Sequence, residues 1–206
     1  DSQPGQWFQG RSLIGAEHGG DEDDFGVTFA NGKLKYAHRD NSDLYSMQPQ
    51  TVYADSRNHL LAIYHEKGST TGDSTVMYLD GRLIAVDDSL NDAMNMDSIF
   101  FGSNLGHTAA MALDADFGDI LFYDAKVRGF NLDRIETYLA LKYGITLGHH
   151  YKLLAGAGNV NLYAIDPIYR QGIIGVGKCT ATLLDQRISE SVSSPGFKIL
   201  YGSQVP

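Results

Sequence analysis

The sequence predicts an all-β sandwich with one short helix, and three observations support this fold class. Two dipeptides, Asn31-Gly32 and Asp80-Gly81, are typical of tight hairpin turns between strands. Short apolar segments bounded by Gly, Asn and Asp recur along the chain at the spacing expected of a sandwich. Helical periodicity is concentrated in one stretch, at about 131–143.

The first predicted hairpin spans Phe25 to His38 and turns at Asn31-Gly32, where both turn residues need positive φ. The expected register pairs Ala30 with Lys33, Phe29 with Leu34, Val27 with Tyr36 and Phe25 with His38. Thr28 and Lys35 then share the opposite face. We expect the Val27 face to be buried and the Thr28 face to be solvated.

A second hairpin is predicted to turn at Asp80-Gly81, with apolar residues on both faces of its strands. Further short strands are expected at Leu60–His65, Ile99–Phe101 and Ile120–Tyr123.

The helix at about 131–143 is predicted to be amphipathic and to lie with one side buried. Asn131 is the expected N-cap, and Gly144 the left-handed residue that ends the helix. The apolar stripe consists of Leu132, Ile135, Tyr138, Leu139 and Tyr143. Asp133, Arg134 and Glu136 are expected to face away from the stripe.

Three segments carry a family resemblance: Tyr138–Leu147 (YLALKYGITL), Val76–Ile84 (VMYLDGRLI), and Ile173–Gly177 (IIGVG) with the polar residues that follow it. They resemble the bacterial laminin G-like domains of the concanavalin A-like lectin/glucanase superfamily. The resemblance implies a jelly-roll sandwich, an extracellular or cell-surface location, and membership of a larger bacterial protein. It places a sandwich domain at residues 1–148 and a β-rich C-terminal extension, packed on that sandwich, at residues 149–206.

Domains of that family begin with several strands before the segment that corresponds to Trp7–Glu17, and this chain begins almost at that segment. The first strands are therefore expected to be absent or to be donated by another chain, unless the local architecture differs from that of the family. Either arrangement leaves an open sheet edge, and an open edge can pair with another chain.

Composition excludes several classes of partner. Sixteen basic and twenty-five acidic residues give a net charge of −9, which argues against binding to nucleic acids or anionic membranes. No segment approaches the ~18 apolar residues of a membrane span. Because the chain begins at Asp1 without a signal peptide, we expect a mature or excised fragment. Cys179 is the only cysteine, so it has no disulfide partner within the chain.

The sequence contains none of the common catalytic motifs, so we predict a protein that is not an enzyme. Glycosidases of the resembled fold use paired carboxylates in strings such as Glu-x-Asp-x-x-Glu, and no such string occurs. Zinc-protease, P-loop, nucleophile-elbow and paired-cysteine motifs are also absent. Adjacent residues in a strand point to opposite faces, so we do not expect His149 and His150 to share a metal ion. Because they follow the predicted helix, they are interpreted as a polar linker.

Two acidic groups are candidate calcium ligands, because calcium prefers six to eight oxygen ligands. The first group is Asp21, Glu22, Asp23 and Asp24, which is either a calcium site or a solvated acidic loop. The second is Asp114 and Asp116, whose alternation would place both side chains on one face of a strand. Calcium is the only cofactor that the sequence suggests.

Candidate sugar ligands combine aromatic rings, which stack on a pyranose, with polar groups that bond its hydroxyls. They are Trp7, Tyr36, His38, Arg39, Asp40, Asn41 and Tyr45.

Three functions are compatible with these features. The first is an extracellular, non-catalytic recognition module that binds a glycan or cell-surface ligand, with or without calcium. The second is a structural subunit that self-associates or accepts a strand from a partner chain at its open sheet edge. The third, a glycan hydrolase or lyase, requires two facing carboxylates in a cleft.

Overall fold

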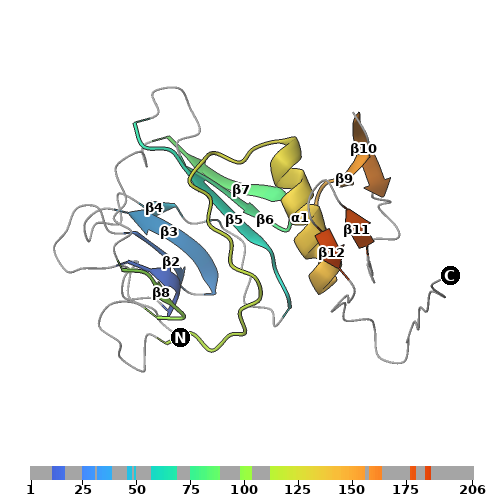
Figure 1. Ribbon diagram of the computed structural model, residues 1–206. Coiled ribbons are helices and arrows are strands. Elements are labelled where there is room, and N and C mark those ends of the chain that lie inside the picture. The colour runs from blue at the N-terminus through green and yellow to red at the C-terminus, as the bar shows by residue number, and fades with distance from the viewer. Residues whose placement is uncertain are drawn as a thin grey trace. The chain divides into compact units, whose positions relative to one another are not determined.

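The structure is a computed structural model, in which antiparallel β-sheets predominate and the described residues contain one helix (Figure 1). The described residues are 11–16, 25–30, 32–38, 46–47, 49, 57–68, 75–88, 98–103, 112–155, 158–163, 177–179 and 184–186.

The chain forms two compact units. The first contains residues 1–57, 61–79 and 83–126, and the second contains residues 58–60, 80–82 and 127–206. The helix belongs to the second unit. The domain boundary that the family resemblance places after residue 148 remains a prediction.

The described residues of the first unit form two sheets. The five-stranded sheet has the order β4-β3-β2-β1-β8. Its strands are β1 (Arg11–Gly15), β2 (Phe25–Ala30), β3 (Lys33–His38), β4 (Ser46–Met47) and β8 (Phe100–Phe101). The three-stranded sheet has the order β5-β6-β7. Its strands are β5 (Leu61–His65), β6 (Thr75–Leu79) and β7 (Arg82–Asp87).

One hydrophobic cluster draws on both sheets of the first unit. Val27, Leu34 and Tyr36 come from the five-stranded sheet, whereas Met77 and Leu79 come from β6 of the other sheet. Burial of these side chains is the main source of stability for two such layers, at about 1.5–3 kcal/mol for each large apolar side chain.

The β2–β3 hairpin has the predicted register, which pairs Ala30 with Lys33 and continues to Phe25 and His38. Gly32 has a φ of 73°, as the predicted turn requires, and Asn31 lies outside the described residues. The prediction of a solvated second face is wrong. Thr28 and Lys35 are buried like the core residues of the opposite face. Alternation within one hairpin identifies which residues share a face, but it does not show whether that face is covered.

The β6–β7 hairpin turns at Asp80 and Gly81, whose φ angles of 51° and 72° confirm the predicted turn. β5 and β8 also confirm predicted strands, with ends that differ by one residue. The strand predicted at Ile120–Tyr123 is wrong, because this segment has no strand pairing in the structure. Its β-forming residues therefore lack the ladder partner that a strand requires.

Helix α1 (Phe130–Tyr143) confirms the predicted helix, but not its cap. Gly129 occupies the N-cap position with a φ of 52°, and no side chain caps the helix, so Asn131 is its second residue. At the other end, Gly144 is left-handed as predicted, with a φ of 68°. The amide of Ile145 donates to the carbonyl of Ala140 at 2.9 Å.

The buried face of α1 is more polar than the apolar stripe suggests. Leu139 and Ala140 are buried, but so are Glu136 and Thr137. The prediction that Glu136 faces away from the buried side is therefore wrong. The reason is polar pairing: residues C-terminal to the helix supply hydrogen-bond partners for Glu136 and Thr137.

The second unit adds two small antiparallel sheets to the helix. β9 (Tyr151–Ala155) pairs with β10 (Gly158–Tyr163), and β11 (Gly177–Cys179) pairs with β12 (Leu184–Gln186). A small core contains Ala140, Ile145, Leu147 and Tyr151. The Tyr151 hydroxyl donates to the carbonyl of Ile145 at 2.9 Å and accepts from the amide of Leu147 at 3.2 Å. Tyr151 thereby fixes the position of the segment that follows the helix.

Within the described residues, no helix has the length and apolar character needed to cross a membrane.

Candidate functional site

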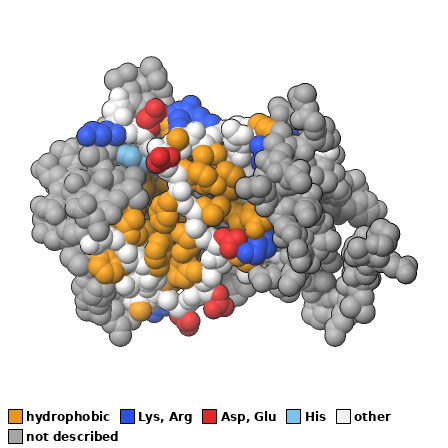
Figure 2. All heavy atoms as spheres, viewed as in Figure 1, with side chains coloured by type: hydrophobic (Ala, Val, Ile, Leu, Met, Phe, Trp, Pro, Cys, Tyr) orange, Lys and Arg blue, Asp and Glu red, His pale blue; other side chains and the backbone are white. Residues whose placement is uncertain are grey.

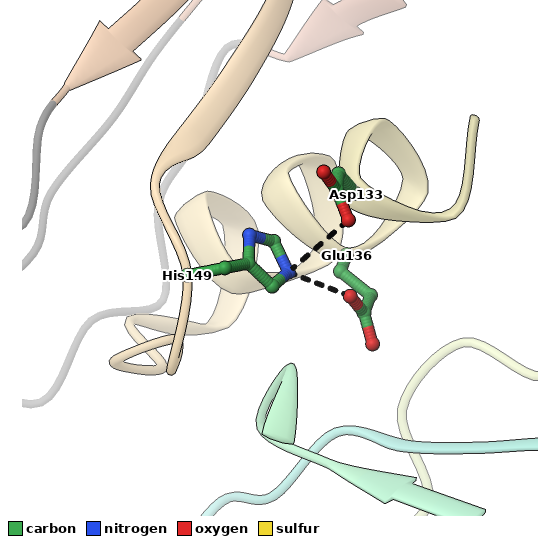
Figure 3. A group of neighbouring side chains, drawn as sticks. All are labelled: Asp133, Glu136 and His149. Atoms are coloured by element: carbon green, nitrogen blue, oxygen red, sulfur yellow. Dashed lines mark hydrogen bonds and ion pairs between the residues drawn. The ribbon is translucent and has the colours of Figure 1, made fainter. Parts of the chain in front are cut away.

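Three ligand-type side chains of the second unit converge at helix α1. Asp133 and Glu136 are one helical turn apart, so they project from the same side of the helix. His149 lies in the segment between the helix and β9. Its imidazole points toward both carboxylates (Figure 3). We call these three residues the acid–histidine cluster.

The shortest contact in the acid–histidine cluster joins Nε2 of His149 to Oε2 of Glu136, at 2.7 Å. Oδ1 of Asp133 lies 3.9 Å from the same nitrogen. One ligand atom from each of the three residues lies within 4.8 Å of the other two. The nitrogen therefore faces two carboxylates at once.

The other nitrogen of His149 fixes the orientation of the ring. Nδ1 lies 2.9 Å from the carbonyl oxygen of His150, which can only accept, so Nδ1 carries a proton and donates it. Burial of the ring lowers the pKa of His149. The hydrogen bonds to Glu136 and His150 and the charges of Glu136 and Asp133 outweigh that effect, so the net pKa is raised above 6.5.

Glu136 is the buried member of the cluster. Its side chain is 3% exposed, compared with 29% for Asp133 and 21% for His149. Oε1 of Glu136 has no hydrogen-bond partner among the described residues. Buried carboxylate oxygens are normally paired, since an unpaired one costs its full desolvation free energy. The cluster therefore contains an oxygen whose binding capacity is unused by the described residues.

The β6–β7 turn contacts the cluster within the second unit. Oδ1 of Asp80 accepts from the Leu60 amide at 2.8 Å, and Oδ2 lies 2.7 Å from Nδ1 of His59. The Asp80 carbonyl accepts from the Gly148 amide at 2.7 Å. These bonds fix the turn so that Gly81 lies against the ring of His149.

The cluster can hold a proton between the imidazole and the carboxylates, or it can hold a cation there. It does not resemble the paired carboxylates of a glycosidase. Those residues flank a substrate cleft, whereas Glu136 is buried and both acids point at one imidazole nitrogen.

A second feature, in the first unit, is a group of exposed apolar side chains. Figure 2 shows hydrophobic side chains gathered across the middle of the viewed face. We define the exposed strip as Phe101, Phe117, Ile120, Leu121, Phe122 and Tyr123, each 41–55% exposed. Phe101 contacts Phe117 and Phe122, with ring centroids 6.5 and 6.2 Å apart.

Most of the predicted sugar ligands lie outside the described residues. This applies to Trp7, Arg39, Asp40, Asn41, Tyr45 and the side chain of His38. Tyr36 is described, and it is 2% exposed in the core of the first unit, where burial raises the pKa of its hydroxyl. A buried ring cannot stack on a sugar at the surface, so Tyr36 is removed from the candidate ligands.

The predicted calcium ligands are not brought together by the described part of the chain. Asp21, Glu22, Asp23 and Asp24 lie outside the described residues. Asp114 and Asp116 are exposed and belong to no described group of three potential metal ligands. They lie in a segment without strand structure, so the strand alternation expected for them is wrong.

Sequence reasoning missed the acid–histidine cluster. His149 was interpreted as part of a linker, and Glu136 was placed on the exposed face of the helix. The available signal was the Asp-x-x-Glu spacing of Asp133 and Glu136, which puts two carboxylates on one helical face. The third ligand comes from beyond the end of the helix, and its position depends on the fold.

Comparison with known proteins gives one family match. No curated protein and no solved structure matches the chain. Residues 131–204 match a family described as a domain of unknown function (DUF8202), and this range includes the whole acid–histidine cluster.

Proposed function

We propose that this chain is a non-catalytic, extracellular recognition module that associates with another protein chain through the exposed strip of its first unit. The supporting observation is that Ile120, Leu121, Phe122 and Tyr123 are consecutive and all 41–55% exposed. A strand packed on one face would bury alternate residues. Consecutive exposure leaves both faces of the segment in contact with water, and large exposed apolar patches mark interaction sites.

The position of the exposed strip favours pairing with a strand. Phe101, which touches two of its rings, belongs to β8, the last strand of the five-stranded sheet among the described residues. The amide of Leu113 donates to the carbonyl of Gly102, just after β8, so the chain itself already occupies this carbonyl and an added strand would pair with β8 before Gly102. A strand added beside β8 would pair with the backbone of β8 and would cover the exposed strip.

Charge around the exposed strip suits a protein partner. Asp114, Asp116, Asp119 and Asp124 are exposed within or beside the 117–123 segment of the sequence, so apolar and acidic side chains alternate there. Interfaces commonly combine an apolar core with a polar rim. We take a second copy of this chain as the partner, which would cover the apolar side chains of the exposed strip and leave the acidic residues at the rim.

Sedimentation analysis over a concentration series tests this proposal. We expect the weight-average mass of the wild-type chain to rise with concentration, and the double variant Phe122→Ser/Tyr123→Ser to remain monomeric. Leu83→Ser is the matched control, because Leu83 is 56% exposed in the same unit but lies outside the exposed strip. A wild-type monomer at every concentration contradicts self-association, and equal association of both variants contradicts the role of the exposed strip.

Glycan binding is the second candidate, because Phe117, Phe122 and Tyr123 present exposed rings that could stack on sugars. A glycan array probed with and without calcium tests it, and the same double variant should lose binding. Calcium-dependent signal would support a role for the acidic residues at 21–24. A chain that neither self-associates nor binds any glycan would contradict the recognition proposal as a whole.

A further inference from the structure

We propose that Asp133, Glu136 and His149 form a binding site for one divalent transition-metal cation of the zinc class. This site lies in the second unit and is independent of the exposed strip. Four lines of argument support it: the donor chemistry, the distances, the hydrogen bond that orients His149, and the unpaired oxygen of Glu136.

The donor set matches zinc better than calcium. Zinc is bound by histidine nitrogen together with Asp or Glu oxygen, and some sites keep a position for water beside three protein ligands. Calcium prefers six to eight oxygen ligands, and an imidazole supplies none. Two carboxylates carry a charge of about −2 when ionised, which a divalent cation would neutralise and an imidazolium would only halve.

The distances are close to those of a ligand shell. With bonds of about 2.0–2.2 Å to the metal, ligand atoms of a tetrahedral zinc site lie about 3.4 Å apart. The separations from Nε2 of His149 are 2.7 Å to Glu136 and 3.9 Å to Asp133. All three ligand atoms lie within 4.8 Å of one another. Small side-chain rotations therefore suffice, and the helix already holds the two acids at a fixed spacing.

The second coordination shell is also in place for His149. Metal-binding histidines usually donate their other N–H to a carboxylate or a backbone carbonyl, which fixes the tautomer and the ring orientation. Here Nδ1 donates to the carbonyl of His150, so Nε2 is the nitrogen directed at Asp133 and Glu136. The ring needs no reorientation to become a ligand.

Glu136 gives the argument for a ligand rather than for an ion pair alone. Its side chain is 3% exposed, and its Oε1 has no partner among the described residues. The ion pair with His149 uses Oε2 and leaves Oε1 unsatisfied, whereas a cation can be bound by both oxygens of a carboxylate.

Zinc titration of the untagged chain against a chromophoric chelator tests the site. We expect one equivalent of zinc to bind, and cobalt to bind with visible absorption bands that report nitrogen and oxygen ligands. Asp133→Asn and His149→Gln should each weaken the apparent affinity for zinc at least about tenfold. Both residues are partly exposed, so these variants avoid substitution of the buried Glu136.

His150→Gln is the matched control, since it changes a neighbouring histidine whose ring is outside the cluster. Its zinc affinity and cobalt spectrum should match those of the wild type. Far-UV circular dichroism identifies any variant that fails to fold. If His149→Gln does not fold, Asp133→Asn still tests the site, because that substitution is isosteric. The proposal is overturned if the wild type binds no zinc, if Asp133→Asn and His149→Gln bind it as tightly as the wild type, or if His150→Gln loses binding equally.

Discussion

The backbone of Gly81 lies directly against the imidazole of His149. A methyl group at Gly81 would come within 2.5 Å of Cδ2 and 2.7 Å of Nε2, which is closer than non-bonded atoms can approach. The hydrogen bonds of Asp80 to Leu60 and Gly148 hold the turn in this position. Position 81 therefore favours glycine for two reasons: its φ angle is positive, and a side chain there would clash with the imidazole.

Substitution of Gly81 should separate these two reasons. Gly68 is the matched control, since its φ of 68° is close to the 72° of Gly81 but nothing lies within 4 Å of its Cβ position. Gly68→Ala should cost about 1–2 kcal/mol of unfolding free energy, the left-handed penalty alone. Gly81→Ala should cost more in the wild-type chain, whereas in a chain that already carries His149→Ala it should cost no more than Gly68→Ala. Urea denaturation of the wild type, the three single variants and the Gly81→Ala/His149→Ala double variant measures this, and equal losses for both glycines in the wild-type chain would refute the steric contribution.

Glu136→Gln should destabilise the protein by about 2–4 kcal/mol, because it removes one member of a buried charged pair and leaves His149 beside a neutral amide. Glu66→Gln is the control. Glu66 pairs with Lys126, but its side chain is 45% exposed, so its loss should cost less than about 1 kcal/mol. Chemical denaturation in the presence of a chelator measures both changes. Similar small losses would mean that the Glu136 pair contributes little.

Thr137 joins helix α1 to β9 by one buried hydroxyl. Its Oγ1 accepts from the Lys152 amide at 2.8 Å and donates to the Asp133 carbonyl at 2.7 Å. Thr137→Val keeps the shape but removes both bonds, and should cost about 1–3 kcal/mol. Thr137→Ser keeps the hydroxyl and should retain slow hydrogen exchange at the Lys152 amide. Unchanged exchange in Thr137→Val would show that this amide is protected by other means.

The metal-free protein should lose stability as pH rises through the pKa of His149. That pKa is raised in the folded state, so the stabilisation is complete below the unfolded value of about 6.5. This stabilisation is lost as the pH rises through the higher pKa that His149 has in the folded state. The facing charged groups are Glu136 and Asp133 on the helix, and Arg82 lies near Gly148. Thermal melts from pH 5 to 9 should show a slope that His149→Gln reduces, and equal slopes would contradict this assignment.

The sequence alone determined features that depend on neighbouring residues. The register from Phe25 to His38 follows from a two-residue turn, because such a turn fixes which residues face each other. The left-handed end of the helix at Gly144 is equally local, since glycine adopts positive φ without a steric penalty.

Only the tertiary structure decided which surfaces are covered. The burial of Thr28 and Lys35 and the exposure of the 120–123 segment depend on the presence or absence of a second layer, which periodicity cannot reveal. The acid–histidine cluster has the same origin. Glu136 and His149 are 13 positions apart, and their contact exists because Tyr151 and the Asp80 turn fix the path of the chain after the helix. Local propensity acts over a few residues, whereas such a contact depends on packing throughout the unit.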